Sequence, residues 1–272
     1  MDHLTRLTLF RSEAAAFDEA VRRAAGGGRE APLVPSCPGW SLSDLVGHLG
    51  GVQRYLAHVL RGKLTAAPDP SDLSLYAIPA DPAVRAAWPM PDRTPNRGPV
   101  PDALLDWSAA AAADLAGALS ELGPDVPVWT WSPDRTSGFW ARMQTIEQAV
   151  HRWDAETVTG DPAPLDPALA ADAVAQTFEV MAPARRGWKP APAGAGERYR
   201  FRRTDGPGSW TVEFTGDEVR TEADGTGPVA VEAEGTASDL ALFLWQRLPA
   251  ARLEVTGDAP LLDHWFTLVP PV

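Results

Sequence analysis

The sequence contains a single cysteine, Cys37, in 272 residues. One cysteine excludes a disulfide within the chain, which fits a reducing compartment such as the cytoplasm. Long hydrophobic runs are also missing, since no segment approaches the roughly 20 apolar residues that a membrane-spanning helix needs. The first residues, MDHLTRLTLF, lack the apolar stretch of a secretory signal. We therefore expect a cytoplasmic protein with no membrane partner.

Positive charge is scarce as well. Lys and Arg number 24 against 36 Asp and Glu, which gives a formal net charge of −12. No local run of basic residues offsets this excess, and an acidic surface repels the phosphates of nucleic acids. The sequence also has no P-loop, no dinucleotide-binding fingerprint and no G-x-S-x-G motif. We therefore expect no nucleic-acid partner, and the usual signatures of nucleotide-binding and serine-hydrolase chemistry are missing.

Apolar residues recur at helical spacing in four segments of the N-terminal part. The second segment begins at Ser41, and Asp44 three residues later completes a variant of the capping box. Four apolar helices predict a bundle. The Pro-rich connection 63–101 is long for a compact domain, which is typical of a functional loop. The predicted helices cover residues 4–25, 41–61, 102–122 and 137–159.

The hydrophobic pattern changes after a Pro-rich link at 161–167. Alternating segments bounded by Gly or Asp predict strands, and these are interspersed with helical patterns. The sequence therefore predicts two domains, a helical one over 1–162 and an α+β one with a mostly antiparallel sheet over 163–272. The predicted elements of the second domain are strands at 199–203, 210–214, 229–233 and 252–256, and helices at 167–182, 237–247 and 260–268.

Three residues of the helical part have the chemistry of a metal site. Glu147 and His151 are four residues apart and therefore share one face of a helix. His48 belongs to another predicted helix, far upstream. Two imidazoles and one carboxylate form a ligand set that leaves a divalent metal one open position. The alternative is ordinary structure, because Glu–His pairs at this spacing are often solvated contacts and a lone His is often a core residue.

The apolar surroundings favour the metal site. His48 lies three residues after Leu45 and four before Val52, and Val150 adjoins His151 in the later segment. A buried histidine or carboxylate needs a partner, and a metal ion supplies one. The other histidines, at positions 3, 58 and 264, are predicted not to be ligands.

Three stretches, in order, carry a family resemblance: VPSCPGWSLSDLVGHLGG, TIEQAVHRWDAETVTG, and the tail VEAEGTASDLALFLWQRLP followed by LEVTGDAPLLDHW. Together they resemble the actinobacterial family of mycothiol-dependent maleylpyruvate isomerases. The resemblance implies an N-terminal four-helix bundle of the DinB type and a smaller C-terminal α+β domain. It also implies a zinc ion held by one His of the second helix and a Glu and a His of the fourth, which correspond to His48, Glu147 and His151.

The resemblance further implies a function. Mycothiol is the expected cosubstrate, and its thiol, activated at the metal, attacks a small unsaturated or electrophilic substrate. The outcome is isomerisation if the thiol leaves again, or S-transfer if it stays. The ligand set also accepts iron, nickel or cobalt. Two other functions stay open: a thiol-independent metal enzyme catalysing hydrolysis or a cyclisation, and a non-enzymatic binding protein.

Three further residues have two interpretations each. Asp154 follows His151 by three residues and is placed to accept the second ring N–H of a metal-ligating histidine, or it is a surface carboxylate paired with Arg152 or with a Lys or Arg elsewhere. Arg247 matches an arginine of the family's C-terminal motif, which implies that it binds a substrate carboxylate. Otherwise it is a cation at the end of a helix. Cys37 has no base beside it in the sequence, so we expect it to pack and not to react.

Overall fold

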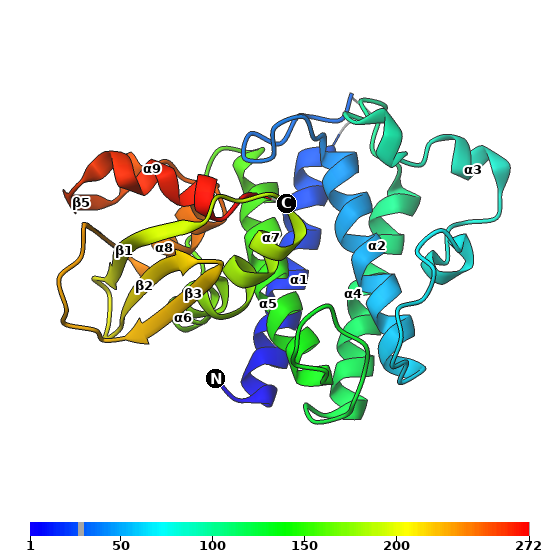
Figure 1. Ribbon diagram of the computed structural model, residues 1–272. Coiled ribbons are helices and arrows are strands. Elements are labelled where there is room, and N and C mark those ends of the chain that lie inside the picture. Colours follow the sequence, from blue (N-terminus) through cyan, green and yellow to red (C-terminus); the bar gives the residue numbers. More distant parts are fainter. Residues whose placement is uncertain (27–29, 272) are drawn as a thin grey trace. The chain divides into compact units, whose positions relative to one another are not determined.

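The computed structural model describes residues 1–26 and 30–271 (Figure 1). The chain divides into two compact units, Met1–Ala163 and Pro164–Val272. The first is helical, and the second contains a five-stranded sheet with helices. Within the described residues, no helix has both the length and the apolar composition to cross a lipid bilayer.

The first unit is built on four long helices, which confirms the predicted bundle. Each of the four contacts the other three, with α1 packed mainly on α5 and α2 mainly on α4. The 63–101 connection contains only short helical turns, η1 (Leu73–Tyr76), α3 (Pro82–Ala86) and η2 (Pro91–Arg93). The long helices are α1 (His3–Ala25), α2 (Leu42–Arg61), α4 (Asp102–Leu122) and α5 (Ser137–Thr157).

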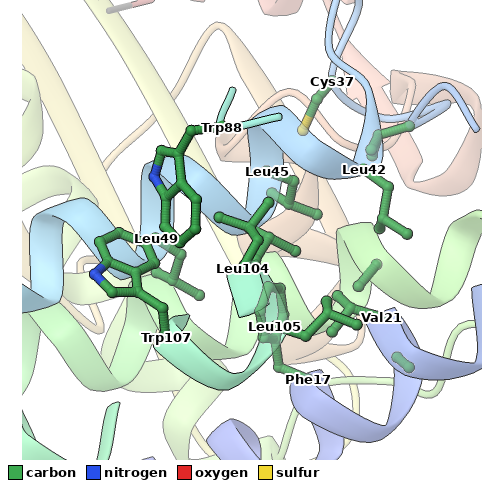
Figure 2. Close-up of a cluster of buried hydrophobic side chains, with 14 residues drawn as sticks. Phe17, Val21, Cys37, Leu42, Leu45, Leu49, Trp88, Leu104, Leu105 and Trp107 are labelled. Atoms are coloured by element: carbon green, nitrogen blue, oxygen red, sulfur yellow. The ribbon is translucent and has the colours of Figure 1, made fainter. Parts of the chain in front are cut away.

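Helix α2 begins where the sequence predicts, at the capping box. The Ser41 hydroxyl accepts a hydrogen bond from the Asp44 backbone N–H, and the Asp44 carboxylate accepts one from the Ser41 N–H at 2.8 Å. Two of the four orphan amides of the helix start are thereby satisfied. The apolar face of α2 then packs into a cluster with residues of α1 and α4, including Trp107, and with Trp88 of the long connection (Figure 2).

The second unit contains a sheet with the strand order β3-β2-β1-β4-β5. Only the β1–β4 pairing is parallel, so the sheet is mostly antiparallel, as predicted. Aromatic residues on one face of the sheet surround Trp265 of α9 (Ala259–Leu268), namely Tyr199, Phe201 and Phe214. The strands are β1 (Gly194–Arg203), β2 (Ser209–Gly216), β3 (Glu218–Ala223), β4 (Val231–Gly235) and β5 (Glu254–Gly257).

Several predicted boundaries of this unit are wrong. Strand β3 was not predicted because its residues are almost all exposed, so its sequence EVRTEA has no buried apolar side to reveal. The predicted helix 237–247 ends at Leu244, as α8 (Ala237–Leu244), and the chain then turns at Gln246 with φ +59°. The predicted helix 167–182 continues to Trp188 as α6 (Pro167–Gln176), a π-helical turn η3 (Thr177–Met181) and α7 (Ala182–Trp188).

Candidate metal centre

Helices α2 and α5 bring His48, Glu147 and His151 together. One potential ligand atom from each lies within 4.8 Å of those of the other two. Glu147 Oε1 lies 3.4 Å from His48 Nε2 and 4.0 Å from His151 Nε2. The two imidazole rings are nearly perpendicular, at 78°, with centroids 5.2 Å apart. Both Nε2 atoms therefore converge on the same carboxylate oxygen.

The three side chains differ in exposure. His151 and Glu147 are largely buried, with 6% and 13% of their side chains exposed, whereas His48 is 35% exposed. The apolar residues that the sequence places around His48 therefore cover it only in part. His48 occupies the boundary of the apolar face of α2, and the Trp40 ring packs against it at a centroid distance of 5.0 Å. The site is thus accessible from the His48 side and closed at His151.

The charge of Glu147 is favoured by its neighbours. Burial raises the pKa of this carboxyl group, but a hydrogen bond from His48, the positive charge that His48 and His151 carry when they are protonated, and a hydrogen bond from Gln144 together hold the pKa below the ordinary value. The Gln144 side-chain amide donates to Glu147 Oε2 at 2.5 Å, which leaves Oε1 toward the histidines. These neighbours therefore favour the carboxylate form of Glu147, which is the form that binds a metal ion.

Asp154 orients His151. The Nδ1–H of His151 donates to Asp154 Oδ2 at 2.9 Å, and the Ser36 hydroxyl donates to Asp154 Oδ1 at 2.6 Å. Asp154 is fully buried, so its interpretation as a surface carboxylate is wrong. A carboxylate accepting from Nδ1 fixes the tautomer with a free lone pair on Nε2, the nitrogen that faces Glu147.

The sequence did not reveal several neighbours of this group. The Cys37 thiol is buried, and its sulfur lies within 4.8 Å of a ligand-type atom of both His151 and Asp154. Nothing local in the sequence predicts that proximity, or that of Ser36, because both come from the loop before α2. Gln144 carried a usable signal, since it lies three residues before Glu147 on the same helical face.

The residues fit a zinc-type ion. Two imidazole nitrogens and one carboxylate oxygen are the ligand types of open zinc sites, and ligand atoms ~2.1 Å from a tetrahedral ion lie ~3.4 Å from one another. The distances from Glu147 Oε1 to the two imidazole nitrogens, 3.4 and 4.0 Å, are close to that spacing. Among the described residues, His3, His58 and His264 belong to no such group, so they are not brought to the candidate centre.

Arg247 lies in the second unit, Pro164–Val272. It follows the end of α8, and its guanidinium donates to the Trp245 carbonyl at 2.9 Å. Burial and the charge of Arg247 lower the pKa of Arg185, a buried residue of α7, to about 10. Two guanidinium groups therefore influence each other within this unit, which the sequence did not predict.

Known proteins resemble this chain in sequence, through family models, and in fold, through solved structures. The family model described as the mycothiol maleylpyruvate isomerase N-terminal domain matches residues 10–156, and the corresponding C-terminal domain model matches residues 168–264. No curated protein matches the chain. Two solved structures are similar in fold: a mycothiol-dependent maleylpyruvate isomerase and a histidine-to-alanine mutant of it. Each aligns with a TM-score of 0.56 and 15% identity over 94% of this chain and 93% of the other.

Proposed function

Because the chain belongs to the mycothiol maleylpyruvate isomerase family, we propose that it is a metal-dependent enzyme that uses mycothiol. In this proposal the thiol of mycothiol reacts with a small unsaturated or electrophilic substrate, in an isomerisation or an S-transfer. The observation that carries the proposal is the convergence of His48, Glu147 and His151 in a chain of this family. These three residues would hold the ion, and zinc suits their nitrogen and oxygen ligands.

The protein's own groups have separate roles in this scheme. A divalent ion at the three residues would supply the positive charge that favours the ionised form of a thiol. Glu147, kept ionised by its neighbours, contributes the negative ligand, and Asp154 holds His151 in the tautomer that offers Nε2. The partly exposed His48 marks the side from which a thiol reaches the site.

Isomerisation and S-transfer begin with the same addition of the thiolate to the substrate. The thiolate adds to one carbon of a conjugated double bond, and the electron pair moves to the electron-withdrawing group. Rotation about the resulting single bond and departure of the thiolate restore the double bond with changed geometry. If a proton is added instead and the thiolate stays, the product is a thioether. Isomerase and transferase therefore share the first step.

We infer that Arg247 binds a carboxylate of the substrate. Burial and the charge of Arg247 lower the pKa of Arg185, which indicates that the two guanidinium groups lie near each other. Neighbouring guanidinium groups favour an anionic ligand. Arg247→Gln should raise KM for a carboxylate-bearing electrophile by roughly tenfold or more. The matched control is Arg220→Gln, an exposed arginine of β3. An equal change of KM in both variants would contradict the assignment.

The first experiment is a measurement of metal content. Elemental mass spectrometry of the purified wild-type protein should give close to one equivalent of a divalent metal, and His48→Ala should lose it. His58→Ala is the control because His58 lies on the same helix, is exposed and belongs to no ligand group of the described chain. Metal retained in His48→Ala would overturn the ligand assignment.

Turnover then distinguishes the rival functions. The wild-type protein should convert maleylpyruvate, or a related electrophile, only when mycothiol is added, and His48→Ala should be inactive. Equal turnover without thiol would favour a metal-dependent hydrolase or cyclase. A metal-loaded protein with no turnover, whose His48→Ala variant loses only stability, would favour a binding protein.

A further inference from the structure

A second site lies in the long connection of the first unit. A pocket of about 290 Å³ opens between residues 85–99 and Ser43, in the first turn of α2. Its lining includes three arginines, Arg85, Arg93 and Arg97, and it shares no residue with the histidine centre. Such a concentration of positive charge is unexpected in a chain with a net charge of −12.

Two of these arginines have no counter-ion in the part of the chain that the structure describes. Arg97 pairs with the Glu30 carboxylate at 2.8 Å. Among the described residues, Arg85 and Arg93 form no ion pair and no side-chain hydrogen bond, and both are exposed. A guanidinium group has five N–H donors arranged for the oxygens of a carboxylate or a phosphate. The pocket therefore offers positive charge and hydrogen-bond donors that no described residue of the protein uses.

The buried carboxylate of Asp44, which is hydrogen-bonded to the pocket-lining Asn96, is not available to the two arginines. Asp44 Oδ1 accepts the Asn96 side-chain amide at 2.5 Å, and Oδ2 accepts the Asn96 backbone N–H at 3.0 Å and the Ser41 hydroxyl at 2.7 Å. Both oxygens of Asp44 are therefore occupied by hydrogen bonds from Asn96 and Ser41. An anion in the pocket would meet arginines and not a competing free carboxylate of this residue.

The same contacts make the pocket a fixed feature. Asn96 joins the connection to α2 through Asp44, and its side chain also donates to the Met90 carbonyl at 3.0 Å. Trp88 is buried and packs edge-on against Trp107 of α4, with ring centroids 5.4 Å apart. Hydrogen bonds of Asn96 and the aromatic contact of Trp88 thus hold the connection against the bundle on either side of Arg93.

We propose that this pocket binds a small organic oxyanion, a molecule with a carboxylate or phosphate group held by Arg85 and Arg93. Trp88 and Met90 line the same pocket and offer an apolar surface to the body of the ligand. Small-molecule pockets usually measure ~300–1,000 Å³, so a volume near the lower end selects a small ligand. The site is independent of the proposed thiol chemistry, because it uses none of the residues assigned to it.

Isothermal titration calorimetry of the full chain tests the proposal. The probes are inorganic phosphate, phenyl phosphate and phthalate, which separate phosphate from carboxylate recognition and reveal the contribution of an apolar body. At least one aryl probe should bind saturably at one site. Arg85→Gln/Arg93→Gln should weaken that binding at least tenfold, and the single variant Arg93→Gln should weaken it as well. Arg11→Gln, which removes one positive charge from an exposed position of α1 as Arg93→Gln does from the pocket, should not change it.

Two further measurements keep the test decisive. Binding should persist in His48→Ala, which separates the pocket from the candidate metal centre, and the thermal unfolding of the arginine variant should match wild type because both positions are exposed. If the double variant does not fold, the single variant Arg93→Gln takes its place. The proposal is overturned if no probe binds saturably, if Arg11→Gln causes an equal loss, or if binding disappears in His48→Ala.

Discussion

At the scale of single residues, Asp154 determines which nitrogen of His151 is available. It is fully buried and accepts hydrogen bonds from both His151 Nδ1 and Ser36. Asp154→Asn removes the charge and offers an amide N–H in place of an acceptor, so the preferred tautomer of His151 is lost. We expect metal affinity to fall ~10- to 100-fold, measured by competition with a chelator of known affinity.

Ser36→Ala provides the graded comparison for that variant. It removes one hydrogen bond to Asp154 and leaves the carboxylate and its contact with His151 intact. Its metal affinity should therefore lie between those of wild type and Asp154→Asn. Equal affinity in all three proteins would show that Asp154 has no influence on the centre.

Asp44 should make stability depend on pH. Burial raises its pKa, but hydrogen bonds from Asn96 and Ser41 outweigh burial and hold the pKa below the ordinary value. A depressed folded-state pKa means that the stabilisation is complete above the unfolded pKa of ~3.9 and is lost as the pH falls through the folded value. Asp44→Asn should therefore be less stable than wild type at pH 7 by about 1 kcal/mol, and this gap should narrow below pH ~4.

Urea unfolding of chelator-treated protein measures that gap without interference from metal release. The exposed Asp161 supplies the control, since Asp161→Asn removes a carboxylate outside the capping box. A gap between wild type and Asp44→Asn that stays constant from pH 7 to pH 3 would contradict the role given to the Asp44 carboxylate.

The residues of the candidate metal centre were only partly predictable from the sequence. The Glu147–His151 pair follows from helical spacing, which is a local property. The meeting of His48 with that pair is a tertiary contact, which the ligand chemistry and the apolar surroundings suggested and the family resemblance favoured further. The approach of Cys37 to His151, and of Ser36 to Asp154, depends on the path of the loop before α2. No local pattern encodes such a path, so these contacts were missed.

At the scale of secondary-structure elements, two adjacent glycines of α2 should respond oppositely to the same change. A Cβ on Gly50 would lie 2.3 Å from the Trp107 ring of α4, whereas a Cβ on Gly51 would meet nothing closer than 4.0 Å. Gly50→Ala should destabilise the unit by about 1–3 kcal/mol through overpacking. Gly51→Ala should stabilise it by about 0.5–1 kcal/mol through helix propensity.

Chemical denaturation of both variants under identical conditions checks this pair. The contact between α2 and α4 would be refuted in its present form if Gly50→Ala were as stable as Gly51→Ala. The metal content of Gly50→Ala should be determined as well, because His48 lies two residues before Gly50 on the same helix.

The elements that were predicted well are those with strong local signals. Helix α2 has a capping box and a continuous apolar face, and α4 has the predicted bounds of Asp102 and Leu122. Strand β3 has neither signal, because it pairs with β2 by backbone hydrogen bonds while its side chains stay in solvent. An edge strand of this kind is stabilised by its neighbour, which a single segment of sequence does not reveal.

At the scale of the whole molecule, metal binding should stabilise one unit and not the other. The proposed ligands all lie in Met1–Ala163, and Pro164–Val272 has its own sheet and aromatic core around Trp265. An ion that binds only the folded state stabilises it by ~4 kcal/mol at a free concentration a thousand times the Kd. Because α2 and α5 supply the ligands, removal of the ion should increase local opening of these two helices.

Hydrogen exchange followed by mass spectrometry measures amide protection in the two units separately. Chelation should accelerate exchange of amides in α2 and α5 and leave those of β1, β2 and β4 unchanged. In His48→Ala the chelator should have no effect on either unit, since the ion is already absent. If exchange accelerated only in the sheet, or equally in wild type and His48→Ala, the chelator would be acting elsewhere. The histidine centre would then not couple metal binding to the stability of the bundle.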